Sequence, residues 1–348
     1  MARMARITLQ EDFTAWLVTA KVVGGGFLLK GQEKERLLDL IRELSAIFFI
    51  HIHTYCIMSN HYHLVLSARN KEVMQASQEE LMARYARLRG DPDATPPSAG
   101  VCTLDGTIRP DSDGGIERLR RRLGDPARFM QELNQRFSLW YNLRNERRGA
   151  FWNGRFHSVL LGDPRAQLVG SAYVDLNPVR AGLVSWSEAY RWCGLGSLHR
   201  GEGWQEGHKQ GFLHPLHRFV EGTDGPEIAG MMSLSFYRGF VALAGARPIP
   251  GKACLSPQMV HELLELHRYL GIGHKLLGRI RNISETVVLG AANLVEMVQR
   301  KRGRKTVGAR NLMGIFHVSR LFRERQSGPT RSLPITVDGQ VIPSLDDG

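Results

Sequence analysis

Two histidines separated by one residue, His61 and His63, lie in the short apolar segment 61–66. In a β-strand, side chains two positions apart project from the same face, so the two imidazoles would lie at a separation that suits one metal ion. A divalent ion that acts on phosphate needs further ligands, so a third protein ligand must come from elsewhere. His51 and His53 form a second such pair on the preceding segment, and hairpin register decides which pair faces the site. We favour His61 and His63.

A tyrosine and an asparagine four residues apart, Tyr173 and Asn177, form the second chemical feature. Asp163-Pro164 starts a helix that Pro178 limits to about residue 177. Residues four apart stack on one helix face, so the Asn177 amide could complete the shell of a metal ion while the phenol lies close to a bound phosphate. By itself, Tyr173 also fits a tyrosine with a buried ring and an exposed hydroxyl.

These residues together match phosphodiester transesterification. The tyrosine oxygen attacks phosphorus, and a divalent metal, Mg²⁺ or Mn²⁺, neutralises and aligns the phosphate. The product is a covalent phosphotyrosine. Because the bond energy is retained, such an enzyme cuts and rejoins strands without a nucleotide cofactor. No Gly-x-x-x-x-Gly-Lys phosphate loop, which a helicase would require, occurs in the sequence.

The surrounding segments predict an α+β sandwich. Residues 14–23 are rich in β-branched and aromatic side chains and end in three glycines, which predicts a strand. Apolar residues three and four positions apart predict a helix over 32–48, and segments 49–57 and 61–66 predict a hairpin. A long helix follows Asp125-Pro126, and 154–161 reads as another strand. Segment 71–124 has weaker patterning and is interpreted as an insertion.

Charge and composition favour a nucleic-acid partner. The formal net charge of the 348 residues is +12, with a sequence pI of about 9.9, which suits a polyanion. No stretch approaches the roughly 18 apolar residues needed to span a bilayer, and the N-terminus lacks a secretory apolar run, so we expect a cytoplasmic protein with no membrane partner. The four cysteines are widely spaced, which argues against a zinc knuckle or a disulfide framework.

Three sequence blocks resemble the REP-associated tyrosine transposases, a branch of the single-tyrosine HUH transposases. They read YCIMSNHYHLVL at 55–66, FWNGRFHSVL at 151–160 and YVDLNPVRAGLV at 173–184. The likeness extends to RFMQELNQRF at 128–137 and covers most of residues 14–190. Two positions depart from the family pattern: Ser59 replaces the usual proline, and Tyr62 replaces an aliphatic residue.

The resemblance implies a ferredoxin-like antiparallel sheet packed by helices, the HUH catalytic domain. It also implies that His61 and His63 are metal ligands and that Tyr173 is the nucleophile. Asn177 is the implied third ligand, with Asp175 or a water as alternatives. The implied substrate is single-stranded DNA with a short REP-like hairpin, cut near its foot to leave a 5′ phosphate on the tyrosine.

Basic and aromatic side chains supply candidates for DNA contacts. Arginine contacts backbone phosphates and tryptophan stacks on unpaired bases, although each such residue can equally be a solvated cation or a core aromatic. The candidates are Arg155, Arg180, Arg136, Trp152, Arg302, Arg304 and Lys305.

A change of composition near residue 194 predicts two units. Residues 1–193 would form the catalytic domain, with the insertion at about 71–124, and 194–326 would form a mostly helical basic domain that could bind DNA. Residues 327–348 are predicted to be a disordered tail. With this extension we expect a monomer rather than a dimer that exchanges the tyrosine helix. Two alternatives remain open: a replication-initiator-like nickase, and a DNA-binding regulator derived from a transposase that no longer cuts.

Overall fold

A computed structural model describes residues 15–90, 114–202, 212–221, 226–246, 251–258, 288–289, 335–337 and 340–342. Its centre is a five-stranded sheet in the order β2-β3-β1-β4-β7. The strands are β1 (Ala15–Lys21), β2 (Ile50–Ile57), β3 (His61–Ala68), β4 (His157–Leu161) and β7 (Val288–Leu289). The first four are antiparallel, and the two residues of β7 pair in parallel with β4.

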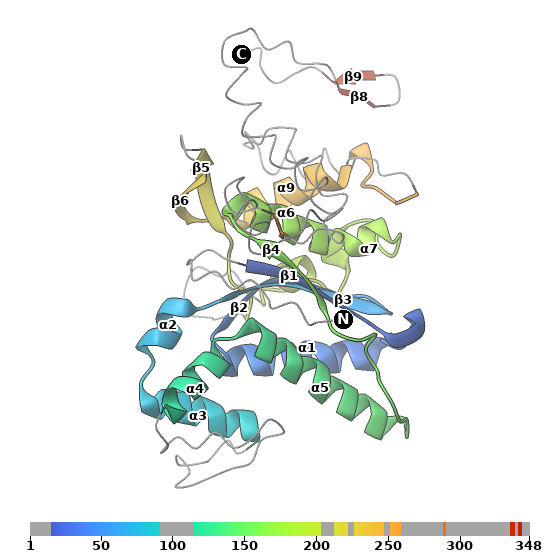
Figure 1. Cartoon of the computed structure of the whole chain (residues 1–348). Helices are drawn as coiled ribbons and strands as arrows, with labels where there is room; N and C mark the ends of the chain where they lie inside the picture. The colour runs from blue at the N-terminus through green and yellow to red at the C-terminus, as the bar shows by residue number, and fades with distance from the viewer. Residues whose placement is uncertain are drawn as a thin grey trace, which may run out of the picture.

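The core of the fold is ferredoxin-like. The order β1–α1–β2–β3–α5–β4 along the chain, with strands arranged β4-β1-β3-β2 in space, is the split βαβ arrangement. Helices α1 (Gly31–Ile47) and α5 (Pro126–Arg144) pack together beneath one face of the sheet (Figure 1). The predicted α+β class, an antiparallel sheet packed by helices, is therefore confirmed.

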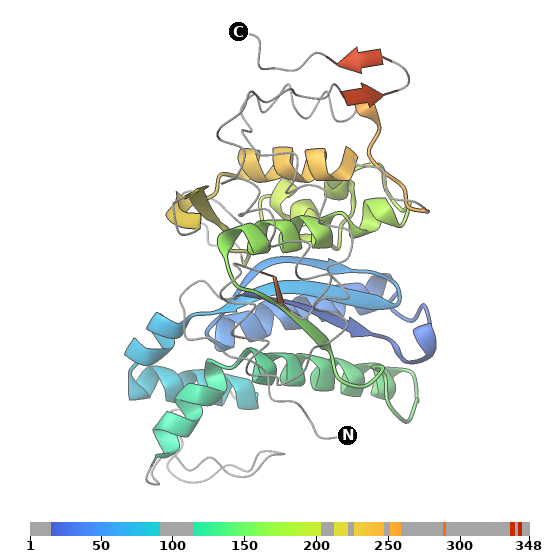
Figure 2. The same cartoon turned by 45° about the horizontal axis from the view of Figure 1, so that its top comes forward.

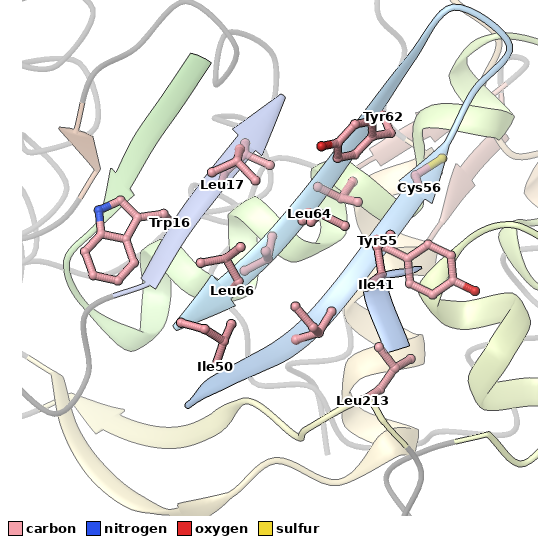
Figure 3. Packing of buried hydrophobic residues seen from close by; sticks show 14 of the residues in the cluster. Trp16, Leu17, Ile41, Ile50, Tyr55, Cys56, Tyr62, Leu64, Leu66 and Leu213 are labelled. Atoms are coloured by element: carbon pink, nitrogen blue, oxygen red, sulfur yellow. The ribbon is translucent and has the colours of Figure 1, made fainter. Parts of the chain in front are cut away.

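The lower layer follows from strand and helix periodicity. Alternate residues of β3, among them Tyr62, Leu64 and Leu66, are completely buried, as are Leu37, Ile41 and Leu44 at helical spacing in α1. Figure 3 shows part of this core, with Tyr62, Leu64 and Leu66 along β3. At the start of α5, the carboxylate of Asp125 accepts a hydrogen bond from the Ala127 amide, and proline occupies the first turn.

A second helical layer covers the other face of the sheet (Figure 1). It contains α6 (Pro164–Asp175), which Asp163 caps by accepting from the Ala166 amide. The helix ends where Pro178 was expected to stop it, and the shorter helix α7 (Asn177–Arg180) follows. The layer continues through η2 (Ser187–Ala189), α8 (Gly194–His199) and α9 (Leu234–Ala246), and Figure 2 shows α9 lying over α6.

The segment interpreted as an insertion is partly built into the core. It contains α2 (Asn70–Gln75), α3 (Gln78–Arg89) and α4 (Gly115–Leu123). Leu81 of α3 and both Leu119 and Leu123 of α4 are completely buried. These helices extend the lower layer beside α1, because their apolar stripes need a surface against which to pack. Residues 91–113 lie outside the described ranges.

The hydrophobic core also continues past the boundary predicted after residue 193. Leu213, Tyr237 and Phe240 are buried in the same cluster as the sheet residues. The hairpin β5 (His217–Glu221) and β6 (Pro226–Met231) leads into α9, and neither had been predicted. Most residues of the helical domain expected at 194–326 lie outside the described ranges. The described helices include none that is long and apolar enough to cross a membrane.

The predicted tail contains a short hairpin. Strands β8 (Ile335–Val337) and β9 (Gln340–Ile342) pair in antiparallel fashion. The remaining element of regular structure, η1 (Val23–Gly25), follows β1. In the sequence, Asp338-Gly339 separates β8 from β9, and this dipeptide is the strongest short-range signal for a hairpin. The sequence therefore held a signal for local structure in a segment expected to be disordered.

Candidate active site

The histidine pair of β3 faces the α6 layer. Tyr62, between the two histidines, points into the lower layer, where it is completely buried and its hydroxyl donates to the Asn134 side chain of α5 at 2.6 Å. Because side chains alternate along a strand, His61 and His63 project from the opposite face. Tyr62 therefore points away from the two imidazoles.

The structure brings three sequence-predicted site residues together. The ring centroids of His61 and His63 are 4.9 Å apart, and those of His63 and Tyr173 are 5.6 Å apart at an interplanar angle of 81°. Tyr173 is half-buried, His61 is half-buried and His63 is buried. A phenol carried by α6 and two imidazoles carried by β3 therefore form one continuous group of rings.

Hydrogen bonds orient both imidazoles. The side-chain oxygen of Asn60 lies 2.6 Å from His61 Nδ1, and because this oxygen only accepts, Nδ1 carries the proton and Nε2 keeps its lone pair. Thr19 Oγ1 lies 2.8 Å from His63 Nδ1. The other ring nitrogen of His63, Nε2, takes no part in this contact. A hydrogen bond to one ring nitrogen fixes the orientation of a histidine that binds a metal through the other.

Both imidazoles are held in their neutral form. Burial lowers the pKa of His61 to about 4, with further contributions from the charges of Lys21 and Lys252. Burial, followed by the charges of His61 and Lys21, lowers the pKa of His63 well below its usual value. At neutral pH the rings therefore present lone pairs rather than protons, which is the state required of a metal ligand.

Asn177 offers a third donor of suitable chemistry. Its amide nitrogen donates to the backbone carbonyl of Tyr173 at 2.8 Å, so the amide oxygen is the atom left for a cation. No group of three or more histidine, cysteine, aspartate or glutamate side chains in the described residues could hold a metal. By donor chemistry alone, two imidazoles and one amide oxygen would suit a divalent ion whose remaining positions are filled by phosphate oxygens and water.

Asp175, the alternative third ligand, is unavailable for that role. Its carboxylate is completely buried and accepts hydrogen bonds from the Thr54 hydroxyl, the Leu195 amide and the Tyr237 hydroxyl. Burial raises its pKa to about 6, against the lowering effect of these donors. The Gly194 amide is a fourth donor, so the carboxylate has no lone pair left to offer a metal near His61 and His63.

The other histidine pair lies at the opposite end of the hairpin. His51 stacks on His214, with centroids 3.6 Å apart, and pairs in register with Ser67 near the end of β3. His53 donates from Nδ1 to the His214 carbonyl at 3.2 Å and accepts at Nε2 from Ser67 Oγ at 2.9 Å. The tertiary structure thus places His63, and not this pair, against the Tyr173 ring.

Several residues of the same sheet face were missed by the sequence analysis. Thr19 and Lys21 of β1 pair with His63 and His61, and Thr19 also pairs with His157 of β4, so all five side chains share one face. The charge of Lys21 lowers the pKa of all three histidines. Within the described residues, every charge that shifts these three pKa values is positive. The sequence signal for this face was the alternation of Thr19 and Lys21 with apolar residues along β1.

Three of the predicted DNA-contact residues have structural roles instead. Trp152 is 7% exposed, donates from Nε1 to the Asn134 carbonyl and packs against Tyr62 and Phe137, so it is wrongly predicted to stack on a base. The Arg136 guanidinium of α5 pairs with Glu132 and donates to the Leu88 carbonyl, in the layer away from the histidines.

The guanidinium of Arg180 is also engaged by the protein itself. It donates to the backbone carbonyls of Ala244 at 2.8 Å and Ala253 at 3.0 Å, and so ties α7 to the segment around α9. Arg155 is exposed in the loop before β4 and keeps its candidacy as a phosphate contact. Arg302, Arg304 and Lys305 lie outside the described residues.

Comparisons with known proteins give limited information. No protein-family model matches the sequence, and no curated protein matches it. Among solved structures, the chain is similar to a REP-associated tyrosine transposase bound to a REP hairpin, with 14% identity and a TM-score of 0.35. The match covers 57% of this chain and 84% of the other. A TM-score at this level does not bear on the function of the chain.

Proposed function

We propose that the chain is a metal-dependent single-stranded DNA endonuclease and strand transferase in which Tyr173 is the nucleophile. The observation that carries the proposal is the contact between the rings of Tyr173 and His63, together with the contact between the rings of His63 and His61. A phenol next to two neutral, oriented imidazoles matches the requirements of tyrosine-dependent phosphodiester transfer.

The charge of the site supports an anionic substrate. Lys21 and Lys252 both act on His61, and the charges that shift the histidines of this sheet face are all positive in the described part of the chain. No carboxylate is among the charged groups that shift these histidine pKa values in the described part of the chain. A concentration of positive charge of this kind favours a bound polyanion. The ammonium of Lys21 would bind a backbone phosphate next to the histidines, and Arg155 would bind another along the strand.

The proposed reaction balances without a nucleotide cofactor. The Tyr173 oxygen forms a bond to the phosphorus of the scissile link, the bond from phosphorus to the 3′ oxygen breaks, and that oxygen leaves as a hydroxyl after taking up a proton. The phenol proton passes to solvent. A divalent cation bound by His61 Nε2, His63 Nε2 and Asn177 Oδ1, either Mg²⁺ or Mn²⁺, would supply charge neutralisation at the phosphate. Attack by a 3′ hydroxyl on the phosphotyrosine reverses the step.

The preferred substrate in this proposal is a single strand that carries a short hairpin. The resemblance of the three sequence blocks to the REP-associated transposases supports this choice. A monomer would suffice, because Tyr173 and the histidine pair meet within one chain.

The direct test is formation of a covalent protein–DNA adduct. Full-length protein is mixed with a labelled hairpin-bearing single strand in Mn²⁺, Mg²⁺ or chelator, and the products are separated in denaturing gels. Adduct is expected with metal only, and mass spectrometry should locate the phosphate on the peptide that contains Tyr173. The Tyr173→Phe protein should bind the strand but form no adduct.

The control is Tyr141→Phe, which removes the hydroxyl of a tyrosine on α5, beneath the opposite face of the sheet. This variant should form adduct at the wild-type rate. Adduct that persists in Tyr173→Phe would overturn the assignment of the nucleophile. Tight binding of the hairpin strand with no adduct in any metal would instead show a non-catalytic DNA-binding protein.

A further inference from the structure

The carboxylate of Asp175 joins three elements that lie apart in the sequence. It accepts from Thr54 of β2 at 2.9 Å, from the backbone amide of Leu195 in α8 at 3.0 Å, and from the hydroxyl of Tyr237 in α9. Asp175 is completely buried, and Tyr237 is 1% exposed. These bonds have no part in the proposed chemistry. Burying a charged group costs free energy that its hydrogen bonds must offset, so we expect the Asp175 carboxylate to have a structural role.

Asp175 lies two residues beyond Tyr173 on the same helix, α6. Successive residues of an α-helix are about 100° apart, so the two side chains project roughly 200° apart, from nearly opposite sides of the helix. Hydrogen bonds on the Asp175 side therefore fix the rotation of α6 about its axis. That rotation decides whether the Tyr173 ring meets the ring of His63.

The space around the carboxylate admits little movement. A Cβ atom added at Gly194 would lie 1.9 Å from Thr54 Oγ1 and 3.1 Å from Asp175 Oδ1. Only a glycine lets the start of α8 approach this closely, and the Gly194 amide also donates to the carboxylate. These groups form a closely packed socket around the carboxylate of Asp175.

Helix α9 reaches the same region through further contacts. Arg180, which follows α6 in α7, donates to the carbonyls of Ala244 and Ala253. A Cβ atom added at Gly245 of α9 would lie 2.9 Å from a side-chain carbon of Leu176, directly after α6. Helix α9 therefore contacts the C-terminal end of α6, and Figures 1 and 2 show the two helices lying side by side.

We infer that Asp175 is the positioning residue for Tyr173, and that α9, through Tyr237, is the element that anchors it. This inference rests on the proposed function of Tyr173. It extends the active site to a segment well beyond the blocks that resemble a transposase, since Tyr237 lies outside residues 14–190. It also gives α9 a role in setting the position of the nucleophile rather than in binding DNA.

The test compares two tyrosine hydroxyls. Tyr237→Phe removes the donor to Asp175, whereas the matched control Tyr190→Phe removes a buried hydroxyl that contacts Lys34 and the Ile57 carbonyl. In Tyr237→Phe, the rate constant for adduct formation at saturating DNA should fall about 10- to 100-fold, with little change in KM, since a small displacement of a nucleophile has effects of this size. Tyr190→Phe should keep the wild-type rate. Equal rates in Tyr237→Phe and the wild type would overturn the inference.

A second measurement is independent of catalysis. With 3-fluorotyrosine at position 173 alone, the ¹⁹F resonance reports on the ring environment, and His63→Ala supplies the reference for a ring without its neighbour. In Asp175→Asn and Tyr237→Phe proteins that remain folded, the resonance should move towards that reference or broaden, and in Tyr190→Phe it should not. An unchanged resonance in Asp175→Asn would refute positioning. Absence of adduct in the wild type would refute the proposed function instead, and the ¹⁹F result would still decide positioning.

Discussion

The rings of His63 and Tyr173 meet almost at right angles, with centroids 5.6 Å apart. The His63 ring comes from β3, an inner strand of the sheet, and the Tyr173 ring comes from α6, a helix packed on that sheet.

Thr19→Val should weaken metal binding. The substitution replaces the hydroxyl beside His63 Nδ1 by a methyl group of similar size, so the ring loses the bond that orients it. Loss of a hydrogen bond that orients a metal-binding histidine lowers metal affinity by about 10- to 100-fold. Calorimetric titration with Mn²⁺ measures the effect, and Ser158→Ala on β4 serves as the control. Equal affinities of the wild-type and Thr19→Val proteins would contradict the proposed role of Thr19.

Lys21→Gln should remove one phosphate contact. Lys21 pairs in register with His61, and its charge acts on both histidines of the pair. Binding of a single strand should weaken, and the slope of log K against log salt should become shallower by about 0.7, the value for one contact with single-stranded nucleic acid. The control Lys71→Gln removes an exposed lysine on α2. A slope that changes equally in both variants would show that only net charge matters.

Trp152→Phe should affect stability and leave DNA binding unchanged. The indole is buried among aromatic rings and donates to the Asn134 carbonyl, so the smaller ring leaves a void and loses this hydrogen bond. We expect a loss of about 1–3 kcal/mol in the free energy of unfolding, measured by urea denaturation. A tryptophan that stacks on DNA would show the reverse, with weaker binding and unchanged stability.

Gly194→Ala should be destabilising by about 1–3 kcal/mol, because the new methyl group would overlap the Thr54 hydroxyl and force the socket of Asp175 apart. The control is Gly31→Ala at the start of α1, where an added Cβ meets nothing within 4 Å. That variant should be neutral or slightly stabilising, since alanine favours a helix. Thermal unfolding of the two proteins gives the comparison, and equal melting temperatures would show that the socket can relax.

The histidines at the opposite end of the hairpin should make the fold sensitive to acid. Burial, and then the charges of His214 and His217, lowers the pKa of His53 to about 4, below the usual value of 6.5. The unfolded chain therefore binds a proton more readily, so this stabilising contribution is complete above pH 6.5 and is lost as the pH falls towards 4. For one such histidine the loss at pH 5 is about 2 kcal/mol.

The measurement is urea unfolding at pH 7 and pH 5. His53→Gln keeps hydrogen-bonding capacity without the proton uptake, so the difference in stability between the two pH values should shrink. His199→Gln, at a largely exposed histidine, should leave the difference unchanged. A pH dependence that is the same in all three proteins would assign the acid sensitivity to other groups.

The sequence alone determined the local elements and their faces. The alternation of His61 and His63 with buried neighbours placed both imidazoles on one face of a strand. The Asp163-Pro164 start and Pro178 set the limits of the helix that carries Tyr173. These features follow from the fixed period of a strand or helix and from the chemistry of capping residues, which act within a few positions along the chain.

Only the tertiary structure decided which faces meet. It placed His63 rather than His51 or His53 beside Tyr173, and it enclosed Trp152 among aromatic rings. It also brought Tyr237 to Asp175 from a helix that the sequence analysis had missed. Strand pairing and helix packing join residues that are far apart in the chain, so a local pattern fixes the direction of each side chain but not the partner that it meets.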